Sequence, residues 1–153
     1  MFEMIITLVI AGVLGTVGAT IMSSGFRTYF LGREVSQDAA QGTLALERIT
    51  RELRTIRSAT AADLNIAPAA PAKITFTDID GNAITYSLAG ATVNRNAQPL
   101  ADNVSDLTFS YLKNDGVNSA GTSAEVYYVT VSVTVKSQNA SMTFRGTVKP
   151  TSF

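Results

Sequence analysis

Hydrophobic residues fill the first part of the chain almost without interruption. Residues 4–22 read MIITLVIAGVLGTVGATIM, nineteen residues without a charged side chain, and Glu3 stands directly before them. A bilayer core about 30 Å thick is crossed by roughly 20 apolar residues of helix. The apolar residues surround the helix instead of forming one stripe, which disfavours a core helix, and the basic start and shorter apolar run of a cleavable signal peptide are missing. The pattern predicts a retained membrane span within residues 1–25.

A second pattern, with the spacing of an amphipathic helix, covers residues 26–60. No proline precedes Pro68, so a helix can continue from about Met4 to about Thr60. Apolar or small residues recur in it at alternating steps of four and three, which marks one helix face: Val35, Ala39, Gly42, Leu46, Ile49, Leu53 and Ile56. We expect the end of this seam, from Leu46 through Ile49 and Leu53 to Ile56, to pack against the chain's own β-sheet. A coiled-coil partner is the alternative.

Residues 61–153 alternate between apolar and polar positions, as half-buried strands do. The clearest pair is a hairpin within residues 74–88, whose strands flank the turn sequence Asp80-Gly81-Asn82. Further strands are expected near 92–94, 107–112, 127–136 and 142–149, and loops at 94–103 and 113–125. Short turns between such strands indicate an antiparallel meander with one buried face. The sequence therefore predicts an α+β fold, in which the amphipathic half of a long N-terminal helix packs on an antiparallel β-sheet head.

Composition narrows the possible chemistry. The 153 residues contain no cysteine and no histidine, and 12 Lys and Arg balance 12 Asp and Glu. This excludes disulfides, the common zinc ligand sets, cysteine nucleophiles and histidine-based triads. We expect neither an enzyme nor a bound cofactor. The run from Asp78 to Asn82 resembles part of a calcium loop, but it lacks the later bidentate glutamate, and we interpret it as a turn.

The predicted helix also carries a row of basic residues, Arg48, Arg51, Arg54 and Arg57. Such a row can contact phosphates. Because Glu47 and Glu52 are interleaved with it, we expect a solvated or subunit-facing surface and no nucleic-acid partner.

Small residues within the apolar segment offer a surface for close helix packing. Ala11, Gly15 and Ala19 stand at four-residue spacing, and Gly12 adjoins them. In membranes such small residues let two helices approach closely. Glu3 is the other candidate functional residue, because a charged side chain at the edge of a span is costly to bury.

Residues 2–15, FEMIITLVIAGVLG, resemble the stretch around the early glutamate of the type IV pilin and type II secretion pseudopilin superfamily. Residues 46–56, 74–88 and 98–112 resemble minor pilins and pseudopilins of the PulJ/PilW-like kind. The resemblance implies a structural, minor subunit of a type IV pilus-like filament or a secretion pseudopilus. It also implies that Glu3 pairs with the N-terminal amine of an adjacent subunit, and that assembly uses Phe2, Glu3, Gly12, Gly15 and Ala19.

The same resemblance implies the partners of the chain. They are copies of itself and other pilin-like subunits, the inner membrane before assembly, the assembly machinery and a prepilin peptidase. The family's prepilins begin with a short basic leader ending in glycine, whereas only Met1 and Phe2 precede Glu3 here. We therefore expect either a gene start upstream of Met1 or a trimmed sequence.

The charges around the span bear on its orientation. Arg27 and Arg33 follow the apolar segment and no basic residue precedes it, which alone would place the head in the cytoplasm. A missing basic leader removes this conflict. We then expect a single-pass inner-membrane protein with its head outside the cytoplasm, and later a periplasmic or cell-surface filament.

A different class of function fits the same pattern. The chain could be a single-span, membrane-anchored extracytoplasmic binding or sensory module that does not polymerise. The sequence also leaves open whether a filament subunit would be major or minor, and whether the filament is a pilus or a pseudopilus.

Overall fold

The computed structural model describes residues 2–66, 72–137 and 140–153. Its elements in chain order are α1 (Phe2–Leu53), β1 (Leu64–Asn65), β2 (Lys73–Thr77), β3 (Ala83–Ala89), β4 (Thr92–Arg95), β5 (Gln98–Ala101), β6 (Val104–Leu112), the short 3-10 helix η1 (Ser123–Glu125), β7 (Tyr128–Ser137) and β8 (Ala140–Val148). The chain divides into two compact units, Met1–Ser36 and Gln37–Phe153. A long N-terminal helix packed on antiparallel sheets confirms the predicted α+β class.

The helix α1 ends at Leu53, earlier than the end predicted near Thr60. Beyond Leu53 the backbone finds partners in the sheet. The N–H of Arg57 donates to the carbonyl oxygen of Thr77 at 2.9 Å, and Ile56 forms an isolated bridge with the residue after β2. These tertiary hydrogen bonds replace helical ones, and no glycine or proline between Leu53 and Thr60 announces the change.

Strands β1 to β5 form a five-stranded antiparallel sheet in sequence order. The predicted hairpin is confirmed, because β2 pairs with β3 and places Phe76 opposite Ile84. The loop expected at 94–103 was wrong in part: β5 lies within it and pairs with β4. The turn between them places Asn96 and Ala97 at φ values of 48° and 65°. An Asn-Ala turn is a weaker hairpin signal than Asn-Gly, which explains why the strand was missed.

Strands β6, β7 and β8 form a separate three-stranded sheet, so the expected single meander is in fact two sheets. The change of sheet occurs between Ala101 and Val104, where Asn103 adopts a left-handed φ of 59°. Two polar side chains of α1 hold this corner. The Gln41 side-chain oxygen accepts the N–H of Asp102 at 2.9 Å, and the buried carboxylate of Asp38 accepts the side-chain amide of Asn103 at 2.9 Å.

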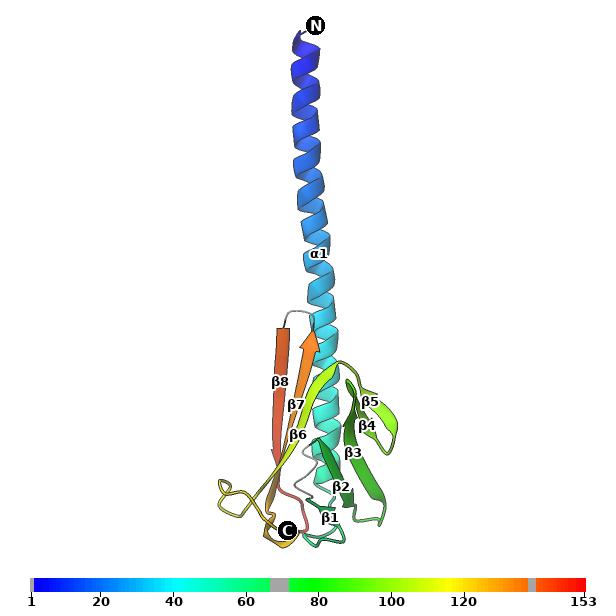
Figure 1. Ribbon diagram of the computed structural model, residues 1–153, viewed down its shortest axis with the longest axis vertical. Helices are drawn as coiled ribbons and strands as arrows, with labels where there is room; N and C mark the ends of the chain where they lie inside the picture. Colours follow the sequence, from blue (N-terminus) through cyan, green and yellow to red (C-terminus); the bar gives the residue numbers. More distant parts are fainter. Residues whose placement is uncertain (1, 67–71, 138–139) are drawn as a thin grey trace. The chain divides into compact units, whose positions relative to one another are not determined.

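The core lies between the sheets and residues 37–53 of α1 (Figure 1). Ile49, Leu53 and Ile56 have no exposed surface, and Leu46 is partly buried against the same cluster. The inner faces of both sheets complete the core with large side chains such as Phe76, Tyr86, Leu107, Val131 and Val133. The helix seam expected to meet a sheet therefore does so within this one chain.

Two glycines allow the helix and the three-stranded sheet to approach closely. A Cβ added to Gly42 of α1 would lie 2.7 Å from Cγ2 of Val135, and one added to Gly146 of β8 would lie 2.8 Å from Cγ2 of Thr50. Real Cβ atoms do not approach other atoms so closely, so a larger residue at either position requires the facing side chains or the packed elements to shift. The sequence pattern placed Gly42 on the seam, and the structure explains why it is small.

Candidate functional site

From Phe2 to Ser36 the first unit is a single stretch of α1, and between residues 4 and 22 its exposed surface carries no charged side chain. The large side chains exposed between residues 4 and 22 are Met4, Ile5, Ile6, Leu8, Val9, Ile10, Val13, Leu14, Val17, Ile21 and Met22. At about 1.5–3 kcal/mol for each such side chain removed from water, covering them is worth on the order of 20 kcal/mol. This part of α1 is long and apolar enough to cross a membrane.

The few polar residues in this segment are satisfied within the helix. The hydroxyl of Thr7 donates to the carbonyl oxygen of Glu3 at 3.0 Å, that of Thr16 to Val13 at 2.8 Å, and that of Thr20 to Thr16 at 2.8 Å. Side-chain hydroxyls that bond back to helix carbonyls need no water. These threonines can therefore lie in lipid or in a packed helix bundle, a point that the sequence pattern did not reveal.

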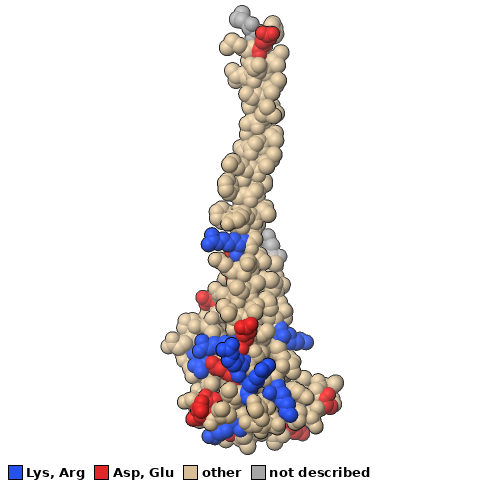
Figure 2. Space-filling view, turned by 180° about the vertical axis from the view of Figure 1, so that it is seen from behind, with Lys and Arg blue, Asp and Glu red and all other residues tan. Residues whose placement is uncertain are grey.

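Charges are absent along this surface. No Lys, Arg, Asp or Glu occurs between Glu3 and Arg27. The space-filling view shows the resulting bare surface, on which the acid near the N-terminus is followed by a long uncharged stretch (Figure 2). Such a surface fits a lipid bilayer or the apolar surfaces of other helices.

The candidate small residues are open to a partner. Among residues 2–66, 72–137 and 140–153, no atom outside the neighbouring helix turns lies within 4 Å of a Cβ built on Gly12 or Gly15. Ala19 is exposed, and its spacing from Gly12 and Gly15, seven and four residues, places all three on one helix face. A second helix could therefore approach the backbone here, because none of the residues that the structure describes covers that face.

Phe2 and Glu3 lie in the first turn of α1. Phe2 is 82% exposed and Glu3 is also exposed. A carboxylate in a first turn is favoured by the partial positive charge of the helix N-terminus. The carboxylate of Glu3 makes no ion pair with another side chain in residues 2–66, 72–137 and 140–153. It is thus available for a cation supplied from outside these residues.

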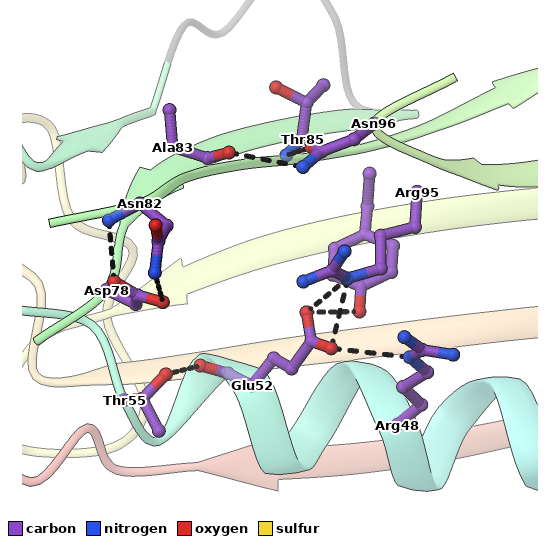
Figure 3. Close-up of polar contacts among 10 residues, drawn as sticks. Arg48, Glu52, Thr55, Asp78, Asn82, Ala83, Thr85, Arg95 and Asn96 are labelled. Carbon is purple, nitrogen blue, oxygen red and sulfur yellow. Dashed lines mark hydrogen bonds and ion pairs between the residues drawn. The ribbon is translucent and has the colours of Figure 1, made fainter. Parts of the chain in front are cut away.

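The second unit carries a polar cluster that the sequence reasoning missed, centred on Glu52 (Figure 3). The Glu52 carboxylate of α1 accepts hydrogen bonds from Nε of Arg95 at 2.8 Å, the hydroxyl of Tyr86 at 2.8 Å and Nε of Arg48 at 3.3 Å. Burial alone would raise the pKa of Glu52, but these hydrogen bonds outweigh it and lower the pKa below its usual value. Burial and the adjacent carboxylate raise the pKa of Tyr86.

This cluster joins the helix to the five-stranded sheet. Arg48 and Glu52 come from α1, Tyr86 from β3 and Arg95 from β4. Arg48, Tyr86 and Arg95 each donate to the Glu52 carboxylate, so this one acid links the helix to two strands of the sheet. The sequence held one sign of this cluster. Glu52 is an acid that directly precedes Leu53, a residue of the helix seam.

The acidic turn considered for calcium binds its own backbone. The Asp78 carboxylate accepts the N–H of Asn82 at 2.7 Å and the side-chain amide of Asn82 at 3.1 Å (Figure 3). It also accepts the N–H of Asp80 at 3.0 Å. The hydrogen bond from the backbone N–H of Asn82, followed by the one from its side-chain amide, lowers the pKa of Asp78. Within the described ranges no group of three or more acidic side chains is placed to hold a metal ion.

Comparison of the chain with protein-family models and with curated proteins found no match. The candidate functional surface is therefore described from the residues of this chain, without a relative to guide it. It consists of the exposed apolar helix with its acid at Glu3, its small-residue face at Gly12, Gly15 and Ala19, and its supporting α+β head.

Proposed function

We propose that this protein is a structural subunit, of the minor kind, of a type IV pilus-like filament or a type II secretion pseudopilus. The observation that carries the proposal is the exposed apolar surface of α1 from Phe2 to Met22, on the same helix whose last turns are buried in an α+β head. A surface this apolar needs a cover, and lipid first and neighbouring stems later would supply one.

In this function the apolar helix has two successive environments. It holds the subunit in the inner membrane, with the head outside the cytoplasm, and then enters the core of a filament among copies of itself or other pilin-like subunits. Exchange of lipid for protein gains little from the hydrophobic effect, so close packing at Gly12, Gly15 and Ala19 provides the attraction. A prepilin peptidase and the assembly machinery act on the chain before and during this step.

Glu3 sets the axial register in this function. An unpaired carboxylate in an apolar filament core costs several kcal/mol, so it needs a cation. The N-terminal amine of an adjacent subunit is such a cation. Because the exposed carboxylate of Glu3 projects from the first turn of α1, a neighbouring stem could reach it.

Replacement of Glu3 tests this function. In cells that assemble the filament, Glu3→Ala should reach the membrane in normal amount but be depleted from sheared filaments. Glu47→Ala is the matched control, since Glu47 is an exposed acid on the same helix and should leave incorporation unchanged. Equal incorporation of both variants would rule out the pairing role of Glu3. Recovery of the wild-type chain from membranes alone, never from filaments, would favour a non-polymerising anchored binding module.

A further inference from the structure

The aromatic residues of the first unit gather at the two ends of its charge-free stretch. Phe2 stands at one end, Phe26, Tyr29 and Phe30 stand at the other, and no aromatic residue lies between. The first basic residues, Arg27 and Arg33, fall in the same short segment as the second group. We call Phe26, Arg27, Tyr29, Phe30 and Arg33 the collar.

The three aromatic side chains of the collar are exposed. Phe26 is 57% exposed, Tyr29 67% and Phe30 62%. Their spacing places these three rings and Arg33 on one side of the helix. The rings of Tyr29 and Phe30 meet edge to face, with centroids 6.0 Å apart. Beside them the missing side chain of Gly25 leaves a shallow, open hollow, which Met22, Phe26 and Tyr29 also line.

The length of the charge-free stretch fits the thickness of a bilayer. Residues 4–26 span about 35 Å at a rise of about 1.5 Å per residue. A hydrocarbon core is about 30 Å thick, and the bilayer is about 40–45 Å with its headgroups. When Glu3 lies at one membrane–water interface, the collar therefore lies at the opposite one.

We propose that the collar is a lipid-interface anchor that sets the depth of α1 in the bilayer. Phe26, Tyr29 and Phe30 occupy the boundary between headgroups and acyl chains, where amphipathic rings are favoured. The hollow at Gly25 admits an acyl chain between the rings, and Arg27 and Arg33 bind lipid phosphates, which guanidinium groups match in geometry. The anchor rests on the membrane-bound stage of the proposed function, and it is independent of filament assembly.

Tryptophan fluorescence tests the anchor directly, because the chain contains no tryptophan of its own. Single Tyr29→Trp, Val13→Trp and Val117→Trp variants of the full-length chain are reconstituted in phosphatidylcholine vesicles containing some phosphatidylglycerol. The lipids carry bromine either near the headgroup or near the bilayer centre. Val117 lies in an exposed loop of the second unit and reports on water.

The expected result is a depth order. Tyr29→Trp is quenched more strongly by the shallow bromine, Val13→Trp more strongly by the deep one, and Val117→Trp by neither. Quenching of Tyr29→Trp that matches either Val13→Trp or Val117→Trp overturns the anchor. A blue-shifted but unquenched Tyr29→Trp also overturns it, because protein would then cover the collar.

Further variants in the Tyr29→Trp background test whether Arg27 and Arg33 bind lipid phosphates. Addition of Arg27→Gln and Arg33→Gln should lower the ratio of shallow to deep quenching, because the helix end is no longer held by phosphates. An unchanged ratio overturns the arginine part of the anchor. Absence of quenching in Val13→Trp has a different meaning: the helix would not enter bilayers at all, and the membrane stage of the proposed function would fail with it.

Discussion

Removal of the Glu52 carboxylate should destabilise the second unit more than removal of the exposed carboxylate of Glu47 on the same helix. In Glu52→Ala the hydroxyl of Tyr86, a fully buried residue, loses its partner at 2.8 Å. A buried polar group left without a partner costs about 1–3 kcal/mol. Arg95 also loses its ion pair with Glu52 in this variant. Because the Arg95 side chain is partly exposed, water can replace the carboxylate, and we expect this loss to cost only about 1 kcal/mol.

The expected total is about 3 kcal/mol, which lowers the Tm of a unit of this size by about 10 °C. The measurement is thermal unfolding of the detergent-solubilised full-length chain, followed by the near-ultraviolet circular dichroism of its tyrosines. Glu47→Ala is the matched control and should change the free energy of unfolding by less than about 0.5 kcal/mol. Equal Tm values for the two variants would falsify the assigned role of Glu52.

A second variant separates the orphaned hydroxyl from general damage. The double variant Glu52→Ala/Tyr86→Phe removes both partners, so its loss of stability should be smaller than the sum of the single losses by about 1–2 kcal/mol. Strict additivity would show that the hydroxyl and the carboxylate do not interact.

The difference in stability between wild type and Glu52→Ala should depend on pH in a defined direction. The folded-state pKa of Glu52 is lowered, so its contribution is complete above the unfolded pKa of about 4.3 and is lost as pH falls through the folded pKa. The Tm difference between wild type and Glu52→Ala should therefore be constant above about pH 5 and shrink below about pH 4. A difference that grows on acidification would contradict this reasoning.

Three further predictions concern packing and membrane insertion. Ile49→Ala should lower the free energy of unfolding by about 2–5 kcal/mol, because Ile49 is fully buried. Leu44→Ala, at an exposed position, is the control and should lower it by less than about 0.5 kcal/mol. Urea titration measures both values. Gly42→Leu should lower stability by about 1–3 kcal/mol in the same assay, because its Cβ alone meets Val135 at 2.7 Å; a neutral result would mean that the sheet moves freely away from α1. Val13→Arg should reduce the carbonate-resistant membrane fraction of the chain, since a charge at the centre of a span costs about 2.5–3.5 kcal/mol, and unaltered retention would refute the span.

Much of the fold could be predicted because its signals are local. The steps of three and four from Gly42 to Ile56 predicted a helix face, which the structure confirms as far as Leu53. Alternation on both sides of Asp80-Gly81-Asn82 predicted the β2–β3 hairpin, which the structure also confirms. The signals that failed were those that depend on tertiary partners. The helix stops at Leu53 because Thr77 offers Arg57 a hydrogen bond, and β5 forms because the side chain of Asn96 binds the backbone of β3 through Thr85 and Ala83.

The candidate assembly surface depends on the sequence alone to an unusual degree. An uninterrupted apolar helix requires no distant residue to define it. Gly15 and Ala19 could therefore be singled out from their spacing and Glu3 from its charge beside the span, while their use in assembly, with that of Gly12, is what the family resemblance implies. Their role in assembly stays a prediction, because it concerns contacts with other chains. The structure adds that the surface around these residues is uncovered and that its threonine hydroxyls are satisfied within the helix.

By itself the sequence determined the apolar helix, its charged and aromatic ends, the amphipathic seam and the order of most strands, because each follows from the periodicity of neighbouring residues. Only the tertiary structure decided that the strands form two sheets, that Gly42 and Gly146 are points of close approach, and that Glu52 joins α1 to β3 and β4. The reason is physical: these features depend on pairs such as Glu52 and Arg95, which are forty-three positions apart in sequence. Local periodicity carries no information about which distant polar groups will meet once the core has closed around them.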